Sequence, residues 1–122
     1  MKKIILAIVF LVFVASAVIY FFQKSRSEKI TGDFAVEISA EGFVPSDLKI
    51  KEGQTVVWIN KDKQYHWPAS NLHPTHEIYP EFDPKEPIEP GKSWSFKFKK
   101  VGSWRYHDHL KPNFTGIITV AK

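Results

Sequence analysis

The sequence contains no cysteine. A disulfide bond, a thiolate nucleophile, an iron–sulfur cluster and a cysteine-based zinc ribbon are therefore excluded. The absence leaves the cellular compartment open, because an exported protein can fold without disulfide bonds. Any metal site in this chain has to be built without a thiolate ligand.

The predicted domain also lacks an excess of basic residues, although the formal net charge of the chain is +4. The basic residues among the first 29 positions account for this excess, and the rest of the chain is formally neutral. A nucleic-acid-binding domain normally carries a basic stripe, so no nucleic-acid partner is expected.

What the chain does have is apolar and aromatic content. Of its 122 residues, 43% are hydrophobic and 15% are aromatic. This composition excludes a disordered chain and favours a single β-rich domain with a modest core.

Residues 4–22 form an apolar run of nearly the length that crosses a bilayer. The run has two interpretations, a cleaved signal peptide with a small-residue site at 15–17 or an uncleaved membrane anchor. We favour the anchor, because cleavage there would leave the apolar stretch 18–22 as the mature terminus. The predicted organisation is an anchor or signal segment at 1–23, a polar tether at 24–32 and a domain at 33–122.

Short alternating segments separated by turns predict β-strands throughout the domain. They are residues 34–38, 48–50, 55–60, 93–98, 101–109 and 116–120. A long proline-rich connection, 69–90, interrupts the series and is of a length that usually has a function. The pattern predicts an all-β Greek-key sandwich preceded by one transmembrane helix.

Two stretches carry a family resemblance. The pattern Phe-x-Pro-x2-Leu-x-Ile-x2-Gly-x-Thr-Val-x-Trp-x-Asn over 43–60 resembles the first half of a cupredoxin. The pattern Gly-x-Trp-x-Tyr-His-Asp-His over 102–109, followed by Gly-x-Ile-x-Val over 116–120, resembles the second half. The resemblance implies a cupredoxin-like sandwich and a copper ligand at His66, just after the Trp-x-Asn strand.

The other ligand positions of that family are not conserved in this sequence. Counting back from Gly116, the cysteine, histidine and methionine positions fall on Asp108, Lys111 and Phe114. The thiolate-ligated blue copper site is therefore excluded, together with the family's familiar electron-transfer role.

The last loop has a second resemblance. The element Tyr-His-Asp-His-Leu at 106–110 is similar to the Tyr-His-Ser-His element of multicopper oxidase domains. Those enzymes need several domains to build their all-histidine copper cluster, so this resemblance implies ligands and not oxidase activity.

All the histidines of the chain lie in its second half, between positions 66 and 109. Neutral imidazole binds Cu(II) and Zn(II), and without sulfur the copper would be tetragonal and type-2-like. The predicted metal ligands are His66, His73, His76, His107 and His109. Of these, His73 is the one most readily explained as an ordinary turn residue.

The alternation of a strand limits how these histidines can combine. His107 and His109 would face away from Asp108, and could meet a site formed by the 69–90 connection or by a second subunit. Asp108 is expected at the surface or in a turn, with two alternatives: binding the metal, or orienting a ligating histidine through a hydrogen bond. The aromatic residues Tyr65, Trp67, Trp104 and Phe114 are expected to pack around the site.

The sequence thus predicts a membrane-anchored domain on the periplasmic or outer side that binds copper, or zinc, for copper handling or tolerance. The alternatives are a type-2 copper oxidoreductase, an accessory component for electron transfer or metal uptake, and a metal-free interaction domain. A redox or metal-transfer protein partner and a homo-oligomer are both compatible with this prediction.

Overall fold

The computed structural model describes residues 1–24, 31–72 and 78–122. This part of the chain contains one helix followed by eight strands. In chain order they are α1 (Lys2–Lys24), β1 (Phe34–Ser39), β2 (Gly42–Val44), β3 (Asp47–Lys51), β4 (Thr55–Asn60), β5 (Pro68–Ser70), β6 (Ser93–Lys97), β7 (Gly102–Asp108) and β8 (Thr115–Ala121).

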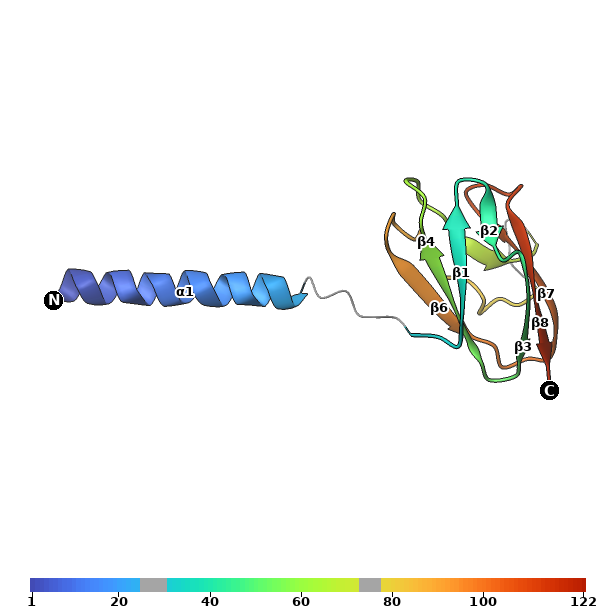
Figure 1. Ribbon diagram of the computed structural model, residues 1–122, viewed down its shortest axis with the longest axis horizontal. Helices are drawn as coiled ribbons and strands as arrows, with labels where there is room; N and C mark the ends of the chain where they lie inside the picture. Colours follow the sequence, from blue (N-terminus) through green and yellow to red (C-terminus); the bar gives the residue numbers. More distant parts are fainter. Residues whose placement is uncertain (25–30, 73–77) are drawn as a thin grey trace.

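The strands form a sandwich of two sheets (Figure 1). One sheet has the order β2-β1-β4-β6, and the other has the order β3-β8-β7-β5. The pairs β1–β4 and β3–β8 are parallel, and the remaining neighbours are antiparallel. This arrangement confirms the predicted all-β sandwich.

Period-two alternation decides which side chains enter the space between the sheets. In β1 the buried positions are Val36 and Ile38, and in β4 the side chains of Val56 and Trp58 are fully buried. In β4 Val57, on the opposite face of the strand, is also buried, which explains why its sequence is the most continuously apolar.

Aromatic rings around Trp58 fill the core. Its ring centroid lies 5.1 Å from that of Phe82, 5.4 Å from Trp94 and 5.6 Å from Tyr106. These are distances at which tilted and edge-to-face rings attract each other. Phe82 belongs to the 69–90 connection, so part of this connection is a component of the core.

Helix α1 contributes nothing to this core. The segment Lys2–Tyr20 is apolar enough to cross a membrane, with a mean hydropathy of 2.6, and none of it is buried against the protein. All core residues lie between Val36 and Val120. The sandwich is therefore complete without the helix.

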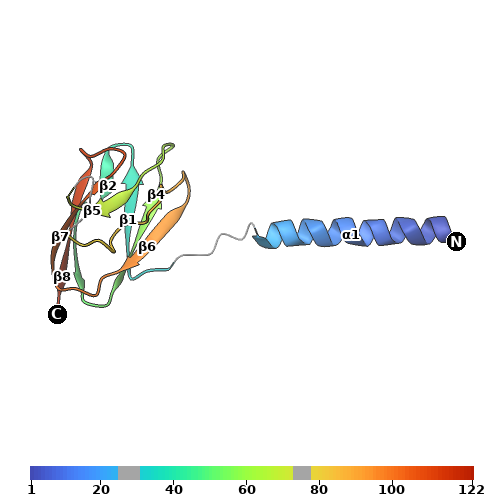
Figure 2. The same ribbon diagram turned by 180° about the vertical axis from the view of Figure 1, so that it is seen from behind.

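Two strands lie where the sequence predicts turn or loop. Strand β2 lies between the predicted strands 34–38 and 48–50, and most of β5 falls in the predicted connection 69–90. Each has three residues and lies at the edge of its sheet, so neither has room to show an alternating pattern. Strand β5 lies beside β7 (Figure 2), where Ala69 pairs with His107.

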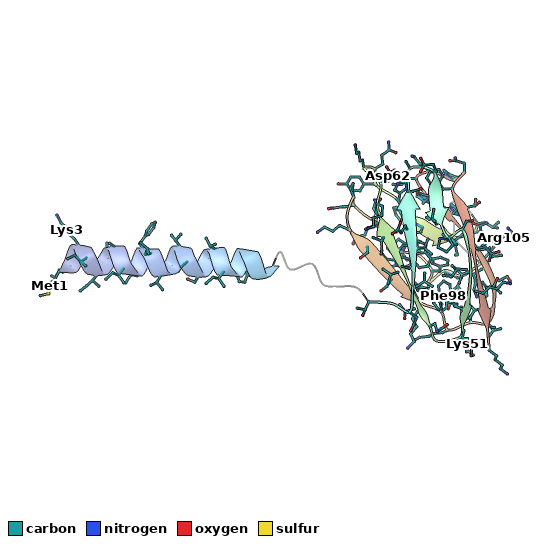
Figure 3. The ribbon with its side chains drawn as sticks, viewed as in Figure 1. Met1, Lys3, Lys51, Asp62, Phe98 and Arg105 are labelled. Atoms are coloured by element: carbon teal, nitrogen blue, oxygen red, sulfur yellow. The ribbon has the colours of Figure 1, made fainter. Side chains whose placement is uncertain are left out.

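The two ends of the sandwich differ in what they hold. The parallel pairing of Phe34 with Val56 places the start of the domain at one end. Asn60, the last residue of β4, lies at the other end, together with Asp62 (Figure 3). Lys51 and the C-terminus are at the same end as Phe34 (Figures 1 and 3).

Candidate metal centre

The segment after β4 and the end of β7 meet at the end of the sandwich that holds Asp62. His66 and Asp108, 42 positions apart in the sequence, are both fully buried there. The ring Nδ1 of His66 is hydrogen-bonded to Oδ2 of Asp108. Folding therefore brings together two segments that are distant in the sequence.

The second ring nitrogen of His66 also faces a carboxylate. Its Nε2 lies 2.8 Å from Oδ2 of Asp62, whose side chain is only 11% exposed. The hydrogen bond from His66, assisted by the backbone N–H of Lys63, holds the pKa of Asp62 below its usual value of 3.8. Carboxylates only accept hydrogen bonds, so both ring nitrogens of His66 are committed to these contacts.

Asp108 is the centre of this cluster. Besides the hydrogen bond with His66, its Oδ1 accepts hydrogen bonds from the backbone N–H groups of Trp67 at 3.0 Å and Leu110 at 2.9 Å. The expectation of a surface position for Asp108 is wrong, because these three hydrogen bonds satisfy a carboxylate that is completely buried. The contact with His66 matches the alternative in which Asp108 orients a histidine.

The remaining cupredoxin ligand positions also pack against one another. The ring of Phe114 stacks on His66 with 5.9 Å between centroids, and Lys111 Nζ lies 5.1 Å from the centroid of Phe114. An imidazole, a carboxylate, a phenyl ring and an ammonium group thus occupy the four positions. We call His66, Asp62, Asp108, Phe114 and Lys111 the inner cluster.

The inner cluster does not fit a copper ion of the blue type. It contains one imidazole, both of whose nitrogens are engaged, and Phe114 and Lys111 offer no ligand that copper prefers. Its hydrogen bonds and ring contacts satisfy its members without a metal.

A second group of histidines lies on the opposite face of β7. Tyr106 and Asp108 point into the sandwich, so His107 and His109 point outward by the alternation of the strand. His107 is nevertheless only 3% exposed. We call His107 and His109 the outer histidine pair.

Asn71 holds His107. The side-chain Oδ1 of Asn71 lies 2.8 Å from Nδ1 of His107. The backbone N–H of Asn71 donates to the carbonyl of Arg105 at 3.0 Å, which continues the β5–β7 pairing by one residue. Its carbonyl accepts the N–H of Ile78 at 2.8 Å.

Trp67 holds His109. The backbone N–H of His109 donates to the carbonyl of Trp67 at 2.7 Å, and their rings lie 4.8 Å apart with an interplanar angle of 44°. The indole N–H of Trp67 donates to Asp83 at 2.8 Å, which fixes the plane of the ring. Strand β5 and its two flanking residues therefore frame the outer histidine pair.

The predicted ligands are thus divided between two places. His66 belongs to the inner cluster, and His107 and His109 belong to the outer pair. His73 and His76 lie outside the described residues. Across residues 1–24, 31–72 and 78–122, no three histidine or carboxylate side chains converge so that one ion could bind them all.

The chemistry of the outer pair fits a borderline metal ion better than that of the inner cluster. It offers two imidazoles, one in β7 and one on the first residue after it, and imidazole suits copper and zinc. Tyr106, the residue before His107, is on the inner face, and burial raises the pKa of its phenol. Its hydroxyl therefore stays protonated and supplies no phenolate ligand.

Sequence reasoning missed Asp62 and Asn71. Asp62 carries no signal beyond its place four residues before His66, and its role depends on how the loop folds. Asn71 has a weak signal: if 67–71 is taken as extended chain, Trp67, Ala69 and Asn71 share one face. Tyr65 is also placed differently from the expectation, because it is 53% exposed and does not pack in the interior.

Comparison with known proteins supports the relationship that the motifs suggest. Residues 9–120 match the family profile described as a cupredoxin-like domain. Amicyanin of Paracoccus denitrificans is 27% identical over 97 residues, which cover 79% of this chain and 71% of amicyanin.

Solved structures agree at the level of the fold. A reduced Cu(I) form of an amicyanin variant superposes with a TM-score of 0.66 at 23% identity, covering 77% of this chain and 87% of amicyanin. A purple cupredoxin from Nitrosopumilus maritimus gives a TM-score of 0.63 at 23% identity, covering 73% of this chain and all of the other. With the family profile spanning the sandwich and the two motif halves in order, this chain belongs to the cupredoxin-like domain family.

Proposed function

We propose that this protein is a membrane-anchored, extracytoplasmic copper-binding protein whose metal ligands are histidines, and that it serves copper handling or tolerance. The observation that carries the proposal is the outer histidine pair, in which the imidazole of His107, in β7, is held by Asn71 and that of His109, the first residue after β7, is held by Trp67. The family relationship supports copper, since the structural relatives include a Cu(I) form.

His66 has no place in the proposed site. Its two ring nitrogens already bond to Asp62 and Asp108, and its partner Asp108 is on the face of β7 opposite to the outer pair. An ion bound by His107 and His109 would have to draw further ligands from another segment.

The segment between Asn71 and Ile78 is the natural source of those ligands. Its two ends are joined by a backbone hydrogen bond beside His107. His73 and His76 are each two residues along the sequence from one of these ends. We include both in the proposed ligand set.

The proposed ion would be type-2-like Cu(II), because imidazole ligands without a thiolate give a tetragonal site. Zinc binds the same donors and is the competing ion. The tether enters the sandwich at the end that holds Phe34, and the proposed site is at the opposite end. It would therefore be open to a redox or metal-transfer partner.

Metal titration of the full chain in mild detergent tests the proposal. Electron paramagnetic resonance should show a type-2 Cu(II) signal with nitrogen couplings. Loss of a hydrogen bond that supports a ligand weakens metal binding about 10–100-fold. His107→Ala and His109→Ala each remove a ligand, so each should lower the affinity for copper by more than this. His66→Gln is the matched control and should retain copper wherever near-UV circular dichroism shows an intact fold.

The alternatives give different outcomes in the same experiment. Copper loss in His66→Gln with an intact fold, and none in the outer-pair variants, would move the site to the inner cluster. Binding of zinc in preference to copper would change the cofactor. Absence of any bound metal would leave a metal-free interaction domain, and turnover of a reductant by the copper form would favour an oxidoreductase.

The location of the domain needs a separate measurement. Protease added to intact cells or spheroplasts should cleave the sandwich if it is on the outer side of the membrane. Protection until the membrane is lysed would contradict the extracytoplasmic assignment.

A further inference from the structure

The contact between Asn71 and His107 determines where the proton of the imidazole lies. The Oδ1 atom of Asn71 is 2.8 Å from Nδ1 of His107. An amide oxygen only accepts hydrogen bonds, so Nδ1 of the ring has to be the donor. In a neutral imidazole a proton on Nδ1 leaves the lone pair on Nε2, which is the atom that can bind a metal.

The position of Asn71 does not depend on this side-chain contact. Its backbone is fixed on both sides, by the carbonyl of Arg105 in β7 and by the N–H of Ile78. Asn71 also lies two residues after Ala69, the partner of His107 in the β5–β7 register, and so on the same outer face. The acceptor is therefore held in place by the sheet before the imidazole engages it.

We propose that Asn71 is the positioning residue of the copper site: it fixes His107 in the Nδ1–H tautomer, so that Nε2 is the atom that binds the ion. This inference rests on the function proposed above. A hydrogen bond to the non-ligating nitrogen orients a metal-binding imidazole and raises its basicity, and loss of such a bond typically weakens metal binding about 10–100-fold.

The tautomer can be measured without metal. The full chain, labelled with ¹⁵N-histidine, is studied metal-free in detergent at about pH 8, where imidazole is neutral. Long-range ¹H–¹⁵N correlation should show the proton of His107 on Nδ1 in the parent and in Asn71→Asp, which keeps an acceptor. Asn71→Ala should lose this preference. A proton on Nε2 in the parent, or an unchanged tautomer in Asn71→Ala, would overturn the inference.

Copper titration of the same proteins tests the consequence for binding. The affinity should fall about 10–100-fold in Asn71→Ala and return to within a few-fold of the parent in Asn71→Asp. Asn113→Ala removes an exposed asparagine from the turn before Phe114 and should bind copper as the parent does.

The two proposals fail in different ways. If the parent binds copper and Asn71→Ala binds it equally well, only the positioning role of Asn71 is refuted. If the parent binds no copper while His107 has its proton on Nδ1, the proposed function is refuted and the positioning role with it, although the tautomer assignment stands.

Discussion

Replacing Asp108 by alanine should destabilise the sandwich more than any surface substitution, because this carboxylate holds the inner cluster together. It is fully buried and accepts hydrogen bonds from the ring of His66 and from the backbone of Trp67 and Leu110. Without it, Nδ1 of a fully buried imidazole faces a cavity, and the two turns lose their direct connection.

The magnitude follows from the burial of both partners. Taking the carboxylate acceptor away from the buried ring of His66 costs about 1.5–3 kcal/mol, the range for a hydrogen bond to a charged group. The two backbone N–H groups lie in part-buried positions where water can replace the lost acceptor, so we add nothing for them. For a domain of this size each kcal/mol lowers Tm by about 4–8 °C, so Asp108→Ala should lower Tm by at least about 6 °C.

Asp108→Asn is the matched control for this prediction. The amide keeps Oδ1 as acceptor for Trp67 and Leu110, and its N–H₂ can donate to Nδ1 of a neutral His66 whose proton lies on Nε2 toward Asp62. We expect a cost of only about 1 kcal/mol for this exchange. Thermal unfolding of the full chain in mild detergent, followed by near-UV circular dichroism, measures both variants.

Two results would refute this reasoning. A drop of less than about 5 °C for Asp108→Ala would mean that the pair contributes less than about 1 kcal/mol to stability. An equal drop for Asn and Ala would mean that the charge of the carboxylate matters and the hydrogen-bond geometry does not.

Three further predictions concern the acid stability, the core and the helix. The hydrogen bond from His66 lowers the pKa of Asp62 below 3.8, so its contribution to stability is present above pH 3.8 and is lost as the pH falls through the lower, folded-state pKa. Asp62→Asn should therefore flatten the stability curve below pH 3.8, and an unchanged acid limb would contradict this. Gly116→Ala would place a Cβ 2.5 Å from the hydroxyl oxygen of the fully buried Tyr106 and should cost about 1–3 kcal/mol in thermal unfolding, a loss that an unshifted Tm would disprove. Deleting residues 1–30 should convert a protein released from membranes only by detergent into a soluble one with the same near-UV spectrum, and continued sedimentation with membranes would count against the anchor.

The fold was accessible from the sequence because its signals are local or have a fixed period. Alternation marks the buried positions of β1, a continuous apolar segment marks β4, and an uninterrupted apolar run marks the helix. The ordered motif halves then indicated the family, and the absence of cysteine excluded the blue copper site. Strands β2 and β5 were missed, since three residues at a sheet edge are too short for a period to be visible.

The division of the candidate site into two parts depends on tertiary structure. The sequence alone determined that His107 and His109 share a face and that Asp108 is on the other, because a strand alternates. Only folding decided that Asp108 pairs with His66, which commits that imidazole to carboxylates, and that β5 carries Asn71 to His107. These contacts join residues 36–42 positions apart, and no local pattern encodes them, since they depend on which strands become neighbours.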